Sequence, residues 1–170
     1  SIGILVVCCL GILISGCGYT NKAMHPHNIR TIAVPTFKNI IPKDSLYTYV
    51  PGLEIDLTNE VIERFQYDGN LKILPEETAD ATLVGKIKRY QQESIRYEER
   101  AAVKEYRLFI VADLILRDNR TDEIIWIEEG FTGRTEYISS GRGAKTERSA
   151  ALSARKDLAK KIVDRVIEDW

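Results

Sequence analysis

The chain has 170 residues, with 24 lysines and arginines against 25 aspartates and glutamates, so its formal net charge is −1. It is 44% apolar and 29% charged, which excludes a disordered, collagen-like or many-span membrane protein. The near-neutral charge argues against a dedicated nucleic-acid-binding protein, which normally has a strong basic excess. At this length we expect one domain with enough chain to bury a core.

The first segment of the chain is apolar and ends in small residues. No charged side chain precedes Lys22, and residues 2–14 are almost entirely apolar. This run is shorter than the roughly 20 residues of a transmembrane helix and has the length of a signal-peptide h-region. Ser15 and Gly16 come directly before Cys17, as in a bacterial lipobox. The alternative is an uncleaved leader, or a buried helix with a chance cysteine.

The resemblance to bacterial lipoproteins implies a covalent lipid on Cys17, which would become the first residue of the mature protein. Residues 1–16 would then be the signal peptide, and residues 17–28 the lipidated N-terminus and a polar tether. We expect no other cofactor. Gly18 stands where an aspartate would favour retention in the inner membrane, so we expect the outer membrane. No cysteine follows Cys17, which excludes a disulfide framework in the domain.

Two later segments carry an apolar residue at every fourth position, which is typical of an amphipathic helix. In the first segment these residues are Leu53, Leu57, Val61 and Phe65. In the second they are Leu158, Ile162, Val166 and Trp170. We therefore predict a helix over residues 53–68, ended by Gly69, and a final helix capped by Thr146.

Runs of β-branched and aromatic residues predict the strands. Residues 106–117 and 123–134 flank a polar turn and indicate an antiparallel hairpin. In the long strand 81–97, alternation places Lys86, Lys88 and Tyr90 on one face. We expect short strands at residues 29–35 and 71–74, and loops at residues 36–50 and 137–145.

The predicted order of elements is therefore β-α-β-β-β-β-α. This order indicates an α+β fold in which two helices pack on one face of a mainly antiparallel sheet of four or five strands, an α/β sandwich. Residues 29–170 would form this single domain.

The domain lacks the usual signs of an enzyme or a metal site. No histidine or cysteine follows His27, which removes the commonest general base and the strongest nucleophile. Residues 141–146 resemble a phosphate loop but do not have its spacing. His25 and His27 have no third ligand nearby, so we interpret them as part of the tether. Glu128 and Glu129 are adjacent, and a strand would point them to opposite faces. We expect neither catalysis nor a bound metal.

Basic residues are better functional candidates. Lys86 and Lys88 lie in one predicted strand, and Arg117 ends another. Cations beside apolar sheet surface could bind an anionic lipid headgroup, because charge-assisted hydrogen bonds to phosphate are strong. We therefore expect Lys86, Lys88 and Arg117 to contact such a headgroup. The alternative is that they are solvated residues that discourage edge pairing.

The chain resembles the LptE family of lipopolysaccharide-assembly lipoproteins. The resemblance rests on four features in order, covers nearly the whole mature chain, and contains no catalytic motif. The features are the sequence Cys17-Gly18-Tyr19, the strand 29–35 followed by Phe37 and Asn39, the helix over residues 53–65, and the segment 79–85 that opens the long strand.

This resemblance implies a non-catalytic outer-membrane lipoprotein on the periplasmic face. Such a protein would plug the β-barrel partner LptD, help it assemble, and contact lipopolysaccharide on its way to the surface. Of the family's functional residues only the acylated cysteine carries over, as Cys17. No family motif maps onto the basic residues, so we expect Lys86, Lys88 and Arg117 to contact lipopolysaccharide on their chemistry alone. The opening strand is also similar to those of other envelope lipoproteins, so an activator of a peptidoglycan synthase is the alternative. A third hypothesis, a lipid carrier acting alone, would need an apolar cavity of several hundred cubic ångströms.

Overall fold

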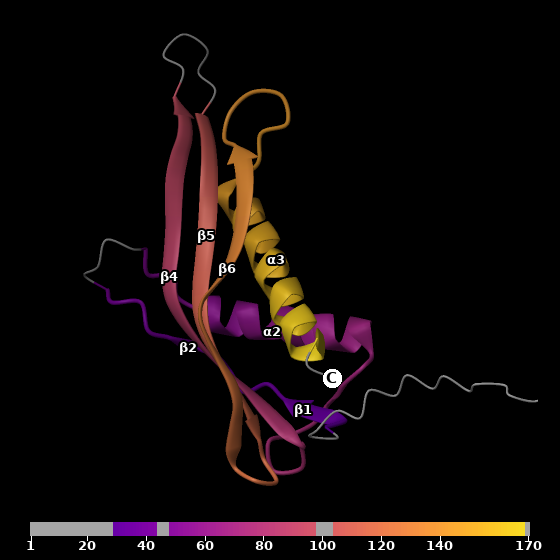
Figure 1. Ribbon diagram of the computed structural model, residues 1–170. Helices are drawn as coiled ribbons and strands as arrows, with labels where there is room; N and C mark the ends of the chain where they lie inside the picture. Colours follow the sequence, from indigo (N-terminus) through magenta and orange to yellow (C-terminus); the bar gives the residue numbers. More distant parts are fainter. Residues whose placement is uncertain (1–28, 44–47, 98–103, 169–170) are drawn as a thin grey trace, which may run out of the picture.

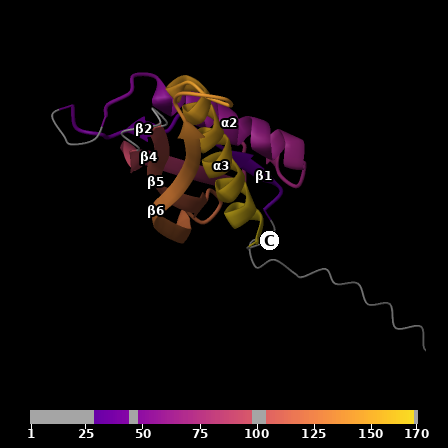
Figure 2. The same ribbon diagram turned by 90° about the horizontal axis from the view of Figure 1, so that it is seen from above.

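Two helices lie on one face of a long, twisted sheet in the computed structural model, which describes residues 29–43, 48–97 and 104–168 (Figures 1 and 2). The helices are α2 (Leu53–Asp68) and α3 (Glu147–Glu168). The strands are β1 (Thr31–Ala33), β2 (Lys38–Asn39), β3 (Lys72–Ile73), β4 (Ala81–Tyr97), β5 (Lys104–Asp118) and β6 (Glu123–Ile138).

The sheet has the strand order β3-β1-β4-β5-β6, and β2 also pairs with β4. Strands β4, β5 and β6 are antiparallel neighbours, whereas β1 and β2 run parallel to β4. The α+β class and the position of the helices are thus confirmed. The long strands are antiparallel, as predicted, while the short strands add parallel pairings, and the sheet has six strands among the described residues. Before α2 begins, the chain runs along one edge of β4 in the same direction as β4. It pairs there first as β1 and then as β2, so both pairings are parallel.

The predicted apolar stripes of both helices form the core, apart from Trp170, which lies outside the described residues. Leu57, Val61 and Phe65 of α2 and Leu158 and Ile162 of α3 are fully buried. They join the inward-facing side chains of β4 and β5 in one apolar cluster. Transfer of these side chains from water is the main force that holds the layers together.

Helix α3 lies unusually close to β6 at Gly133. A Cβ atom on this residue would clash with Cβ of Leu158 and would lie 2.5 Å from the carbonyl oxygen of Ala154. There is no room for a lipid chain between α3 and β6 at this point. This close packing argues against the hypothesis of a lipid carrier with a large internal cavity.

The structure corrects the predicted face of Tyr90. The pairing of β4 with β5 shifts register between Ile87 and Arg89, so that an extra residue enters β4 at Lys88. The bulge reverses the alternation, and Tyr90 turns into the core, where it is 3% exposed. Its hydroxyl donates a hydrogen bond of 3.0 Å to Glu147 at the start of α3.

Three further observations complete the comparison with the predicted elements. Strand β2 lies within residues predicted as a loop, and β6 continues to Ile138, past its predicted end. Thr146 caps α3 as predicted, because its Oγ1 accepts a hydrogen bond from the Ser149 N–H. Within the ranges that the structure describes, no helix is both long enough and apolar enough to cross a membrane.

Candidate functional site

The sheet has an open face, which we define as the side of β4, β5 and β6 opposite the helices. Leu114 and Leu116 of β5 point to the helices and are fully buried. Because side chains alternate along a strand, Asp113, Ile115 and Arg117 lie on the open face. All three residues are partly exposed. This face is therefore available to a ligand or a partner.

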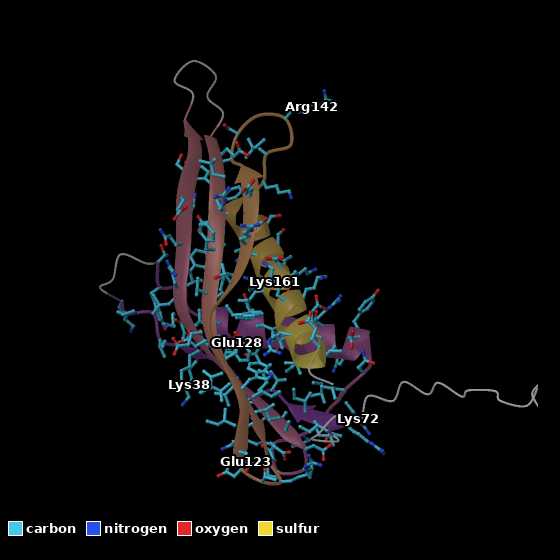
Figure 3. All side chains as sticks on the ribbon, viewed as in Figure 1. Lys38, Lys72, Glu123, Glu128, Arg142 and Lys161 are labelled. Carbon is cyan, nitrogen blue, oxygen red and sulfur yellow. The ribbon has the colours of Figure 1, made fainter. Side chains whose placement is uncertain are left out.

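Three lysines gather on the open face where β2 meets β4. Lys38 of β2 is the direct neighbour of Lys86 in the parallel pairing of these strands. Both side chains are exposed, and neither has an ion pair among the described residues. Figure 3 shows Lys38 on the side of the sheet away from the helices. Like charges directly opposite each other destabilise a sheet. Lys38, Lys86 and Lys88 are called the lysine cluster below.

One carboxylate touches the lysine cluster. Asp113 lies opposite Lys86 in β5, and its Oδ2 is 2.9 Å from Nζ of Lys88. The hydrogen bond to Asp113 raises the pKa of Lys88. Burial works to raise the pKa of Asp113, but the hydrogen bonds from Lys88 and from the N–H of Gly130 outweigh it and lower that pKa. Asp113 is thus fully charged at neutral pH and directly occupied by Lys88, which leaves Lys38 and Lys86 for an external anion.

An aliphatic row runs across the open face beside the lysine cluster. Val84, Ile115 and Ile127 are direct neighbours across β4, β5 and β6. Ile127 is 54% exposed, although its side chain is large and apolar. Val84 is two residues from Lys86 in β4, a separation of about 7 Å. The open face therefore offers cations and apolar surface side by side, which suits an anionic amphiphile.

The structure brings Lys86 and Lys88 together, as predicted, but separates them from Arg117. Arg117 pairs with Thr82 in the sheet, four residues along β4 from Lys86, or about 14 Å away. Its guanidinium contacts Glu76 at 2.9 Å and Asp122 at 3.3 Å. Arg117 is thus occupied by two carboxylates near the turn between β5 and β6.

Lys38 was not among the residues predicted to bind lipid. It lies within residues 36–50, which have no alternation of apolar and polar residues to indicate a strand. Only the parallel pairing of β2 with β4 places it beside Lys86, a residue 48 positions later. A pairing of this range leaves no local signal in a single sequence.

The cysteine, the two histidines and the adjacent glutamates singled out in the sequence are not part of the lysine cluster. Cys17, His25 and His27 lie outside the described residues. Among the described residues no three histidine, cysteine or acidic side chains come close enough to hold a metal ion. Glu128 and Glu129 diverge as predicted: Glu128 accepts a hydrogen bond of 2.8 Å from Arg165 of α3, whereas Glu129 is exposed.

Comparisons with known proteins agree with this architecture. The family model described as "LptE: Lipopolysaccharide-assembly" matches residues 29–166. Protein XCC0632 from Xanthomonas campestris has a similar structure, with a TM-score of 0.54 and 15% identity over 88% of this chain and 89% of that one. The hypothetical protein CT253 from Chlamydia trachomatis gives a TM-score of 0.51 and 12% identity over 81% of this chain and 95% of that one. At these identities the two likenesses show the fold alone. No curated protein matches the sequence.

Proposed function

The chain belongs to the LptE family of lipopolysaccharide-assembly proteins, and from this we propose that it is a non-catalytic lipoprotein at the periplasmic face of the outer membrane. In this proposal it forms a complex with the β-barrel LptD and supports the export of lipopolysaccharide. The lipid on Cys17 anchors it, and residues 18–28 form the tether. The observation that carries the proposal is the lysine cluster beside the aliphatic row.

The chemistry of the open face matches that of lipopolysaccharide, which combines phosphate groups with acyl chains. Lys38 and Lys86 would donate charge-assisted hydrogen bonds to a phosphate. Val84, Ile115 and Ile127 would contact an acyl chain and lose their exposure to water. Arg117 is not part of this site, because its guanidinium is engaged by Glu76 and Asp122.

The proposed partnership with a barrel is supported by the rigidity of the domain. A plug must keep its shape against the wall that surrounds it. One continuous apolar cluster joins both helices to the sheet, and α3 lies against β6 closely enough to require Gly133. Such a filled interior resists deformation.

Binding to lipopolysaccharide tests the role of the lysine cluster. The double substitution Lys38→Ala/Lys86→Ala should weaken binding of the full chain, in mild detergent, to immobilised lipopolysaccharide on the order of tenfold, because two charge-assisted contacts are lost. Surface plasmon resonance measures the dissociation constant. The matched control is Lys72→Ala/Lys156→Ala, which removes the same charge from two exposed lysines on β3 and α3. Equal affinities for the two double variants would overturn the assignment of the site.

Purification from the native host tests the partner. A C-terminal tag on the unaltered chain should recover a large β-barrel protein in near-equal amount from membranes solubilised in mild detergent. Recovery of a peptidoglycan synthase instead would overturn the proposed partner and favour the alternative. This outcome does not depend on the lysine cluster, so the partner and the lipid site can fail separately.

A further inference from the structure

The outer edge of β6 has no neighbouring strand in the described sheet, and the proposed function does not use it. β6 pairs with β5 on one side and is the last strand in the order of the described sheet. It has 16 residues, so its outer edge is long. The N–H and C=O groups on such an edge are a template for pairing with another chain.

Two side chains from α3 bind directly to this edge. The N–H of Arg134 donates a hydrogen bond of 2.9 Å to Oδ2 of Asp157. Nζ of Lys161 donates one of 3.1 Å to the carbonyl oxygen of Thr132. Asp157 and Lys161 are one helical turn apart and also form an ion pair of 2.7 Å. Figure 3 shows Lys161 projecting from α3 beside β6. The pair therefore occupies one donor and one acceptor that face away from β5.

The segment of β6 behind this pair is complementary to a second copy of itself. Thr132, Arg134 and Glu136 alternate along the strand and share the open face, where Glu136 also forms an ion pair with Arg107 of β5. If two copies of β6 paired antiparallel about Thr135, Arg134 of each copy would lie opposite Glu136 of the other. Opposite charges in this position stabilise a sheet, and the arrangement would occur twice.

We propose that the Asp157–Lys161 pair is an edge cap that prevents two copies of this chain from joining through β6. The helix itself packs on the inner face through Ala154 and Leu158, so its contribution at the edge consists of these two side chains. Further along the same edge, the carbonyl oxygen of Ile138 is held by the N–H of Lys145 at 2.8 Å. While they occupy the Arg134 N–H and the Thr132 carbonyl, a second β6 cannot form its hydrogen bonds there. The inference is independent of what the open face binds.

The test removes the cap and measures the mass of the full chain in mild detergent. Asp157→Ala/Lys161→Ala should shift the protein from monomer towards dimer as its concentration rises from about 1 to 100 μM, a twofold rise in mass measured by light scattering. The matched control is Lys160→Ala/Asp164→Ala. This pair has the same residue types and a spacing of four on α3, and also an ion pair of 2.7 Å, but it makes no hydrogen bond to β6 in the described structure.

A third variant separates edge pairing from association caused by unfolding. Adding Arg134→Pro to the uncapped protein removes the outward N–H and should restore the monomer, because proline is tolerated on edge strands and blocks their pairing. A mass for Asp157→Ala/Lys161→Ala equal to that of the control at every concentration would overturn the proposal. So would an increase in mass that Arg134→Pro does not reverse.

Discussion

Asp80 shows how a single side chain joins segments that are far apart in the sequence. Its Oδ2 accepts hydrogen bonds from the N–H of Arg30 at 2.9 Å, the N–H of Thr31 at 3.0 Å and the hydroxyl of Thr31 at 2.9 Å. The Thr31 hydroxyl in turn accepts a bond from the N–H of Asp80. These contacts fix the start of β1 beside the start of β4 and so set the register of the parallel pair.

Asp80→Asn should destabilise the protein by about 1–2 kcal/mol at pH 7, because a charged acceptor of three hydrogen bonds becomes a neutral one. Burial works to raise the pKa of Asp80, but the hydrogen bonds from Arg30 and Thr31 and the charge of Arg120 lower it below the ordinary value of 3.8. A carboxyl group whose pKa is lowered in the folded state stabilises the fold at pH values above its ordinary pKa. This contribution is lost as the pH falls through the lowered pKa.

The measurement is the free energy of unfolding in urea from pH 7 to pH 2. The difference between the unaltered protein and Asp80→Asn should be full at neutral pH and shrink below about pH 4. Asp122→Asn is a control, since that carboxylate is 82% exposed. A difference for Asp80→Asn that stayed constant over the whole range would show that the carboxylate charge is not the cause.

At the scale of elements, the sequence predicts those helices and strands whose apolar residues recur with a regular local spacing. The stripes of α2 and α3 and the hairpin of β5 and β6 follow from spacing alone, and the structure confirms them. The bulge at Lys88 could not be predicted from spacing, because nothing in the alternation of β4 marks an extra residue. Strand β2 is too short to show a period, and it exists only because β4 offers an edge to pair with.

Phe37 illustrates this dependence of one element on others. Its ring is 2% exposed, and its N–H donates a hydrogen bond of 2.9 Å to Oγ1 of Thr58 in α2. Gly85 of β4 lies beneath the ring, and a Cβ atom there would come within 2.5 Å of the ring carbons. The chain that leads into β2 is therefore held between β4 and α2 by one aromatic side chain and one glycine.

This contact predicts a non-additive pair of substitutions. Gly85→Ala should cost about 1–3 kcal/mol through overpacking, and Phe37→Ala about 3–5 kcal/mol through lost burial. Once the ring is gone, the added methyl group has space, so the double variant should cost less than the sum by at least about 1 kcal/mol. The measurement is the free energy of unfolding in urea of the unaltered protein, the two single variants and the double variant. Additive costs would mean that the methyl group clashes elsewhere.

At the scale of the whole molecule, the two faces of the sheet have different roles. The face under α2 and α3 makes the core, and its residues could be predicted from their spacing except beyond the bulge, where Tyr90 turns inward. The open face carries the candidate site, and two of the three lysines of that site could be predicted. Lys86 and Lys88 lie in one strand, whereas Lys38 comes beside them through a pairing 48 residues apart. Arg117 has similar chemistry, but its guanidinium is engaged by Glu76 from the turn before β4 and by Asp122 from the turn before β6.

The proposed anchor lies outside this folded body, and this separation gives the last prediction. Every buried residue of the described core lies at or after Ile29, so Cys17→Ala should leave the thermal unfolding of the domain unchanged. The same substitution should release the protein from membranes, because stable attachment requires two or more acyl chains and the variant cannot be acylated. Fractionation of cells that lack the barrel partner, followed by immunoblotting of membrane and soluble fractions, measures the release.

Cys9→Ala provides the matched control, since it removes a thiol from the segment expected to be cleaved and should leave the attachment intact. If Cys17→Ala stayed in the membrane fraction without the partner, the lipid would not be the anchor. The open face would then have to reach the bilayer by its own contacts, and the lysine cluster would be the first place to look for them. Combining Cys17→Ala with Lys38→Ala/Lys86→Ala would decide this, because only attachment through the open face is sensitive to those lysines.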